Sequence, residues 1–239
     1  RREKAPWPVL ALVGYTNAGK STLFNRLTGA NVMAQDLLFA TLDPTMRAVR
    51  LPGVEKAILS DTVGFISDLP TQLVAAFRAT LEEVTAADVV IHVRDIANPE
   101  SAAQKGHVLA VLADLGLLEE DGSQPTVPII EVWNKWDLLD PERAGELLAQ
   151  AGASGDQLVV PVSALTGEGC EDMLTAANKL LTDNAREHVF VLPAADGQRL
   201  AWLHAHGEVL SDVDEDGAEP QRRLHVRMTP REFGRYNRM

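Results

Sequence analysis

A glycine-rich segment near the start of the chain has the residue types that hold a phosphate chain. Residues 14–21 read G-Y-T-N-A-G-K-S and fit the pattern G-x-x-x-x-G-K-[ST] at every fixed position. In this pattern backbone N–H groups surround the β-phosphate, Lys20 reaches the β- and γ-phosphate oxygens, and Ser21 offers its hydroxyl to Mg²⁺. The sequence therefore predicts a nucleotide-phosphate site. Its residues are Gly14, Tyr15, Thr16, Asn17, Ala18, Gly19, Lys20 and Ser21.

A second segment has the residue types that recognise a purine base. Residues 134–137 read N-K-W-D and directly follow an apolar run. The Asp137 carboxylate can accept hydrogen bonds from N1–H and N2–H of guanine, a pair of donors that adenine lacks, so it would favour GTP over ATP. Asn134 can tie this segment to the glycine-rich loop, the stem of Lys135 can cover the base, and a backbone N–H from 163–165 can reach guanine O6. The predicted base-binding residues are Asn134, Lys135, Trp136, Asp137, Ser163, Ala164 and Leu165.

Two further segments can detect the γ-phosphate. Residues 61–64 read D-T-V-G and follow another apolar run. Asp61 would hold Mg²⁺ through water, and the Gly64 N–H can bond the γ-phosphate and move when that group leaves. The loop before this run contains Thr41 and Thr45, and a threonine there should coordinate Mg²⁺ only when the γ-phosphate is present. Spacing alone does not choose between the two threonines.

The residue after Gly64 is Phe65, at the place where Ras-like GTPases have a glutamine that orients the attacking water. Phenylalanine cannot hydrogen-bond to water. Either Phe65 is a core residue and the water is oriented by another group, or GTP turnover is slow until a partner orders the site. We favour the second interpretation, and we assign no side chain as a general base.

These segments lie between short apolar runs, which is the pattern of a doubly wound α/β sheet. Continuous apolar runs of this length are typical of strands buried on both faces of a parallel sheet. Such a sheet binds its ligand beyond the carboxyl ends of its strands, where the motifs above begin. We therefore predict an α/β P-loop NTPase fold with a mostly parallel sheet. The runs lie at 9–13, 57–59, 89–93, 129–132 and 158–160, with helical patterns between them.

The pattern changes after about residue 184. The final part reads as strand, helix, strand, strand and helix, and the last helix begins at a capping box, T-P-R-E at 229–232. We interpret it as a small α+β domain. The predicted parts are a linker remnant at 1–8, a GTP-binding domain at 9–184 and a C-terminal α+β domain at 185–239.

Composition limits the classes of partner. The 239 residues carry a net charge of −12, which argues against a protein that coats nucleic acid non-specifically. Residues 221–239, however, hold six arginines and one acid, either as a solvated face or as a contact for a phosphate-rich partner. No apolar run approaches the ~20 residues that cross a bilayer. The single cysteine, Cys170, excludes an intramolecular disulfide and fits a reducing compartment, so we expect a cytoplasmic protein.

Together these segments resemble the HflX GTPases. The resemblance implies GTP or GDP as ligand and a slow GTP hydrolase that is activated by the ribosome. By similarity with the related Obg pattern, it implies that Thr41 is the Mg²⁺ threonine, within a contact segment of Phe39, Ala40, Thr41, Leu42 and Asp43. The resemblance rests on 14–25, 38–45, 61–66, 69–70 and 73–83, and more weakly on 192–197 and 206–209.

The resemblance also implies a partner, the large ribosomal subunit, and in bacteria the splitting of stalled or idle ribosomes, notably after heat stress. An alternative is a GTP-switched binding module in ribosome assembly or RNA-related regulation, with hydrolysis only as a timer. Family members carry a further N-terminal domain, so we expect this chain to be a fragment that lacks it, and to act as a monomer. The residues predicted to contact Mg²⁺ are Ser21, Thr41 and Asp61, those predicted to contact the γ-phosphate side are Asp61, Thr62, Val63 and Gly64, and those predicted to be catalytic are Lys20, Thr41 and Gly64.

Overall fold

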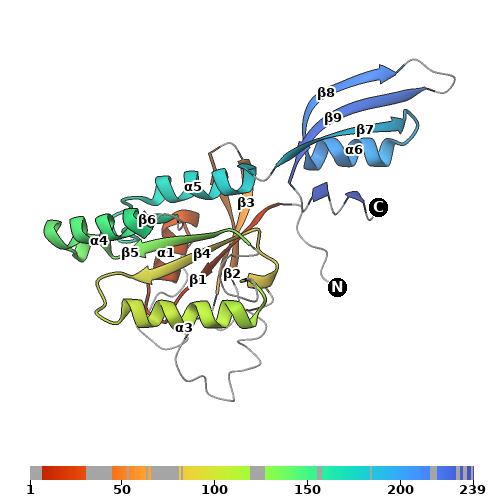
Figure 1. Cartoon of the computed structure of the whole chain (residues 1–239). Coiled ribbons are helices and arrows are strands. Elements are labelled where there is room, and N and C mark those ends of the chain that lie inside the picture. Colours follow the sequence, from red (N-terminus) through yellow and green to blue (C-terminus); the bar gives the residue numbers. More distant parts are fainter. Residues whose placement is uncertain are drawn as a thin grey trace. The chain divides into compact units, whose positions relative to one another are not determined.

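The computed structural model of the chain forms two compact units (Figure 1), one of Trp7–Asn178 and one of Lys179–Met239. The domain boundary that we place after residue 184 stays a prediction. The structure describes residues 7–30, 45–52, 54–62, 64–65, 81, 83–118, 127–154, 158–183, 185–215, 220–229, 232–233, 236–237 and 239.

The first unit is built on a six-stranded sheet with the order β2-β3-β1-β4-β5-β6. Neighbouring strands are parallel except β2, which is antiparallel to β3. This confirms the predicted α/β fold with a mostly parallel sheet. The strands are Val9–Val13 (β1), Thr45–Leu51 (β2), Val54–Asp61 (β3), Val89–Asp95 (β4), Ile129–Asn134 (β5) and Val159–Pro161 (β6).

Helices connect these strands and cover the sheet. In Figure 1, α3 lies against one face and α1 against the other. None of the helices in the described ranges has both the length and the apolar character that a membrane crossing requires. The helices of this unit are Lys20–Thr28 (α1), Ser101–Asp114 (α3), Pro141–Ser154 (α4) and Cys170–Asp183 (α5), with a short 3-10 helix at Trp136–Leu138 (η2).

The strand order marks the carboxyl end of β1 as the place where a binding crevice is expected. That strand lies between β3 and β4 and is parallel to both. The chain leaves β1 toward β3 on one side and reaches β4 on the other, so the carboxyl end of β1 is the topological switch point, where sheets of this kind bind ligands. The glycine-rich loop begins there, directly after Val13.

The apolar runs did not predict β2. It is an edge strand whose residues are mostly exposed, apart from Val49 and Leu51, and it includes Arg47 and Arg50. An edge strand needs no continuous apolar run, and charged side chains on it discourage pairing with other chains. Thr45, one of the two candidate Mg²⁺ threonines, is the first residue of β2 and the register partner of Asp61.

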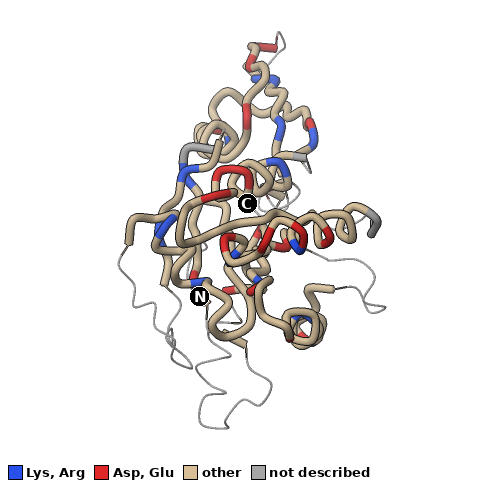
Figure 2. The backbone as a smooth tube through the Cα atoms, turned by 90° about the vertical axis from the view of Figure 1, so that its left-hand side faces the viewer, with Lys and Arg blue, Asp and Glu red and all other residues tan. Residues whose placement is uncertain are grey.

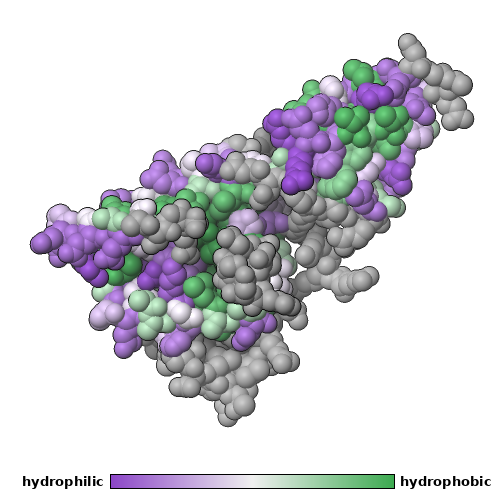
Figure 3. Space-filling model, viewed as in Figure 1, coloured by the Kyte–Doolittle hydropathy of each residue, from purple (hydrophilic) through white to green (hydrophobic). Residues whose placement is uncertain are grey.

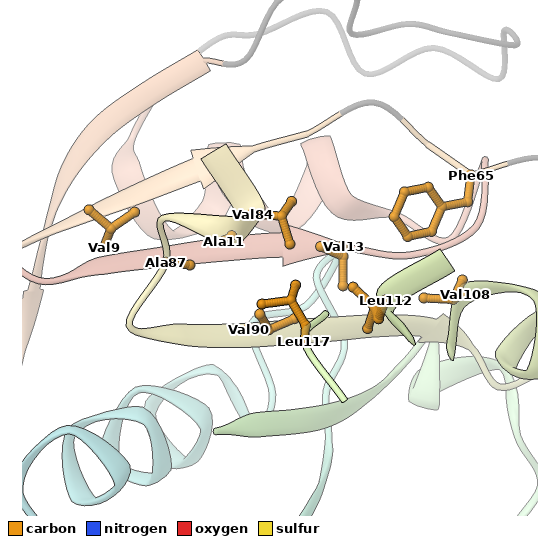
Figure 4. Close-up of a cluster of buried hydrophobic side chains, with 10 residues drawn as sticks. All are labelled: Val9, Ala11, Val13, Phe65, Val84, Ala87, Val90, Val108, Leu112 and Leu117. Carbon is orange, nitrogen blue, oxygen red and sulfur yellow. The ribbon is translucent and has the colours of Figure 1, made fainter. Parts of the chain in front are cut away.

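An apolar core supports the crevice from one face of the sheet. Alternate residues of β1 pack with Val108 and Leu112 of α3, all of them buried. Phe65 is 2% exposed and belongs to the same cluster. Figure 4 shows Phe65 at the end of the cluster where Val13 and Val108 lie. Phe65 is therefore a core residue, as in the first of our two interpretations, in which another group orients the attacking water.

The second unit has a three-stranded antiparallel sheet of order β7-β9-β8 that packs on one helix. The observed order agrees with the predicted strand, helix, strand, strand. The capping box is formed: the Thr229 N–H donates to Glu232 Oε2 at 3.1 Å, and the Glu232 N–H donates to Thr229 Oγ1 at 3.3 Å. Exposed apolar residues also lie on this unit, as Figure 3 shows. The elements are Arg186–Pro193 (β7), Gly197–His206 (α6), Glu208–Glu215 (β8) and Gln221–Met228 (β9).

The arginines of β9 have acidic partners within this unit. Arg222 lies 2.7 Å from Asp212, and Arg227 lies 2.9 Å from a Glu187 oxygen. The acidic residues lie on β8 and the arginines on its neighbour β9, so that opposite charges face each other across the pair. Figure 2 shows blue and red segments close together in this unit. For the arginines of β9, these ion pairs favour the interpretation as a solvated face over the interpretation as a contact for a phosphate-rich partner. The remaining arginines of the segment, Arg231, Arg235 and Arg238, lie outside the described residues.

Candidate nucleotide-binding site

The glycine-rich loop has the backbone of a phosphate-binding turn. Asn17 and Gly19 have left-handed conformations with φ of 59° and 95°. Left-handed residues in such a turn gather successive N–H groups toward one point, where an anion fits. Gly19 is required for a second reason: a Cβ at this position would lie 2.1 Å from Asn134 Nδ2. The loop can therefore keep its shape against β5 only with glycine there.

Lys20 lies inside this loop and is 6% exposed. Its Nζ donates to the Gly14 carbonyl at 3.2 Å and to the Tyr15 carbonyl at 3.0 Å. Burial lowers the pKa of Lys20 to about 8, and the nearby Asp61 carboxylate opposes part of that shift. A bound phosphate group would add further negative charge beside this buried ammonium. The position agrees with the predicted role of Lys20.

The predicted Mg²⁺ residues Ser21 and Asp61 lie together. The Ser21 hydroxyl donates to Asp61 Oδ2 at 2.7 Å, and Asp61 is fully buried at the end of β3. A hydroxyl and a carboxylate are hard oxygen donors of the kind that Mg²⁺ uses beside nucleotide phosphates and water, so these residues fit that ion. The described residues include no cluster of three His, Cys, Asp or Glu that would hold a metal alone.

The segment after β3 is bonded to the glycine-rich loop. The Phe65 N–H donates to the Gly14 carbonyl at 3.0 Å, and the Thr16 N–H donates to the Phe65 carbonyl at 2.8 Å. Between them, Gly64 passes so close that a Cβ would lie 2.8 Å from Thr16 Cα and 3.1 Å from Lys20 Nζ. A movement of this segment therefore changes the surroundings of Lys20 directly.

Asn134 joins the predicted phosphate and base segments. Its Nδ2 donates to the Ala18 carbonyl at 2.8 Å, and its Oδ1 accepts from the Ala164 N–H at 3.0 Å. Asn134 is 2% exposed, and Ser163 beside Ala164 is fully buried. The tie to the glycine-rich loop that we predicted for Asn134 is thus present. It also engages one of the N–H groups of the run 163–165.

The other base-segment residues are less buried than Asn134, and only Asp137 among them is exposed. Lys135 has a left-handed backbone with φ of 63°, and its Nζ lies 2.7 Å from Asp95 Oδ2. Asp137 is exposed in η2. The ring of Trp136 stacks on Trp133 with centroids 6.1 Å apart, so Trp136 packs against the protein. Asp137 is therefore accessible to a ligand, whereas Trp136 contributes its backbone and the packing of the segment.

Of the remaining predicted site residues, the structure describes Thr62. The Thr62 hydroxyl donates to the Leu12 carbonyl at 2.5 Å, which fixes the end of β3 to β1. The predicted γ-phosphate and Mg²⁺ residues that lie outside the described residues are Phe39, Ala40, Thr41, Leu42, Asp43 and Val63.

Two residues near the site were missed by the sequence analysis. Asp95 ends β4 and pairs with Lys135, and an acidic residue at the carboxyl end of a predicted strand is a signal that could have identified it. Arg26 of α1 donates through Nε to the Ala164 carbonyl at 3.1 Å. No motif predicts Arg26, because it acts on backbone carbonyls that are distant in sequence.

A phosphate loop after β1 and an N-K-x-D segment after β5, joined at one edge of a mostly parallel sheet, define a P-loop GTPase domain. The family model described as 50S ribosome-binding GTPase matches residues 9–135, and the one described as HflX C-terminal domain matches residues 147–239. The chain belongs to the HflX GTPase family, which confirms the resemblance.

Known relatives agree with this assignment. A GTPase HflX from Magnetococcus marinus is 44% identical over 98% of this chain and 51% of its own length, and one from Akkermansia muciniphila is 41% identical over 88% and 46%. The crystal structure of a GTP-binding protein from Sulfolobus solfataricus in complex with GDP is similar with a TM-score of 0.55 and 30% identity, over 72% of this chain and 52% of that one. The chain therefore spans about half the length of the curated relatives that it matches.

Proposed function

We propose that the chain binds GTP and GDP at the crevice of β1 and hydrolyses GTP. The observation that carries this proposal is the Asn134 bridge, which joins Ala18 of the phosphate loop to Ala164 of the predicted base loop. One side chain thereby ties the proposed phosphate subsite to the proposed base subsite. Family membership and the GDP complex of a similar protein support the same ligand.

The reaction is attack of water on the γ-phosphate, and this chain contributes charge and position. Lys20 neutralises the β- and γ-phosphate oxygens, and the loop N–H groups surround the β-phosphate. Ser21 and Asp61 would hold Mg²⁺ with Thr41, and the ion supplies positive charge to the phosphate oxygens when bound. No side chain acts as a general base in this proposal, so the water must be positioned by backbone groups and by a partner.

Loss of the γ-phosphate is expected to release Gly64, whereas Phe65 stays bonded to the glycine-rich loop. The Gly64 N–H would bond this phosphate, and Gly64 lies against both Thr16 and Lys20. When the terminal phosphate leaves, this contact and that of the Thr41 segment are lost together. GTP and GDP forms would then present different surfaces to a partner, which is the property of a switch.

The partner that we propose is the large ribosomal subunit, which the family description names. Because Phe65 replaces a water-orienting glutamine, we expect slow turnover by the chain alone and activation on the ribosome. We further propose that the whole protein acts as a monomer in the cytoplasm and splits stalled or idle ribosomes under stress. A GTP-switched binding module in ribosome assembly or RNA-related regulation, with hydrolysis only as a timer, is the second candidate.

GTP hydrolysis measured with purified ribosomal subunits tests this proposal. We expect multiple-turnover hydrolysis by the chain to rise at least about tenfold with large subunits, since a partner that orients the water needs to lower the barrier by only about 1.4 kcal/mol for that factor. Small subunits serve as the matched control and should leave the rate unchanged. Equal stimulation by both subunits, or by neither, would argue against the large subunit as the activating partner.

A further inference from the structure

Arg26 connects the phosphate helix to the predicted base loop. It lies in α1, whose first residue is Lys20. Its Nε donates to the Ala164 carbonyl at 3.1 Å, and its Nη2 donates to the Leu165 carbonyl. An exposed arginine on a helix ordinarily extends into solvent, whereas Arg26 directs two of its donors at consecutive backbone carbonyls. The loop is thus held from α1 as well as from Asn134.

These contacts fix the direction of one particular N–H group. A peptide unit is planar and trans, so its C=O and the following N–H point in opposite directions. When Arg26 holds the Ala164 carbonyl, the Leu165 N–H must point away from α1. Of the N–H groups in this described run, that of Ser163 donates to the Glu168 carbonyl at 2.9 Å and that of Ala164 donates to Asn134. The Leu165 N–H is the group that remains for a ligand.

We propose that Arg26 is a positioning residue for guanine recognition: it holds the Ala164–Leu165 peptide so that the Leu165 N–H donates to O6 of the base. This inference rests on the proposed nucleotide site. Recognition of guanine is then divided between two independent parts. Asp137 reads N1–H and N2–H from one segment, and the peptide held by Arg26 reads O6 from the other.

The division makes a prediction about nucleotide analogues. IDP lacks the exocyclic N2 amine and keeps O6, so it reports on Asp137. 6-Thio-GDP keeps N1–H and N2–H and carries sulfur, a larger and weaker acceptor, in place of O6, so it reports on the Leu165 N–H. In the native chain both analogues should bind more weakly than GDP, each by roughly five- to tenfold, the worth of about one hydrogen bond.

The test is competition of GDP, IDP and 6-thio-GDP with a fluorescent GDP at pH 7, for the native chain and for Arg26→Met. We expect Arg26→Met to weaken the binding of GDP by roughly five- to tenfold, because one hydrogen bond is lost. The affinity for 6-thio-GDP should change little. The ratio of the Kd for 6-thio-GDP to the Kd for GDP should therefore approach one in Arg26→Met. The ratio of the Kd for IDP to the Kd for GDP should stay as it is in the native chain. A purely structural role would weaken all three nucleotides by the same factor.

Two controls make the outcome specific. Arg143→Met removes an exposed arginine of α4 that pairs with Glu146, and it should leave all three constants unchanged. Thermal unfolding of Arg26→Met should match that of the native chain, because the side chain is exposed. An unchanged preference over 6-thio-GDP, or equal weakening of the three nucleotides, overturns the role of Arg26. A native chain that binds GDP no better than IDP would instead contradict the proposed function.

Discussion

Replacing Lys20 with methionine is expected to abolish GTP binding. The ammonium would make charge-assisted hydrogen bonds to β- and γ-phosphate oxygens, and losing two of them, at about 1.5–3 kcal/mol each, raises Kd by at least about 100-fold. Methionine keeps the length and apolar stem of the side chain, so the buried space stays filled. Calorimetric titration with GTP and GDP measures the loss.

The same substitution is expected to leave the fold intact. Burial lowers the pKa of Lys20 from 10.5 to about 8, so its charged form is disfavoured in the folded chain. The unfolded chain therefore binds more protons between these two pH values, and the contribution of Lys20 to stability rises with pH across that window. This rise should be absent from Lys20→Met. GDP affinity of the native chain should fall above pH 8, as the ammonium loses its proton.

Lys179→Met is the matched control, because Lys179 is exposed on α5. It should bind GTP and GDP as the native chain does and should keep the pH dependence of both stability and affinity. If Lys20→Met retains native affinity in a folded chain, the phosphate group does not lie where we place it. A variant that unfolds is distinguished from this case by its circular dichroism spectrum.

Asp137→Asn is expected to change the preferred base from guanine to xanthine. An asparagine offers one acceptor and one donor, so it matches the N1–H and C2 carbonyl of xanthine and no longer matches the two donors of guanine. We expect GDP to weaken by at least about 100-fold, since a site built on hydrogen bonds strongly rejects a base that leaves them unmade. XDP should bind Asp137→Asn better than GDP does. Competition binding with both nucleotides measures this reversal.

Asp172→Asn provides the control for Asp137→Asn. Asp172 is an exposed acidic residue in the first turn of α5, so its substitution changes net charge by the same amount without touching the predicted base segment. It should keep the native preference for GDP. Retained guanine preference in Asp137→Asn would remove Asp137 from the base site, whatever the phosphate loop does.

The sequence predicted the fold and the site to the extent that their signals are local. Residues 14–21 carry their own loop geometry, and Asn134 comes directly after a run that is typical of a buried strand. Because parallel strands end at one edge of the sheet, two motifs more than 100 residues apart had to meet. The contact between Asn134 and the glycine-rich loop could therefore be predicted from the sequence, although its exact partner atom could not.

Contacts between separate elements were not predictable in this way. Glu131 lies in an apolar strand and is 1% exposed, and it is neutralised by Arg94 of β4 and by Lys105 of α3, whose Nζ lies 2.6 Å away. Each of these residues looks like an ordinary surface charge in the sequence. Arg26 is similar: its partners are backbone carbonyls, which leave no trace in residue type. The edge strand β2 was missed because its exposed positions carry no periodic apolar signal.

A guanine nucleotide is proposed to occupy the crevice at the end of β1. Calorimetric titration of the native chain with GDP and with ADP under identical conditions tests it most directly. We expect one GDP per chain and an affinity for ADP at least about 100-fold lower, because adenine presents no N1–H and no N2 amine to Asp137. Equal affinities for the two nucleotides, or no heat of binding with GDP, would contradict it.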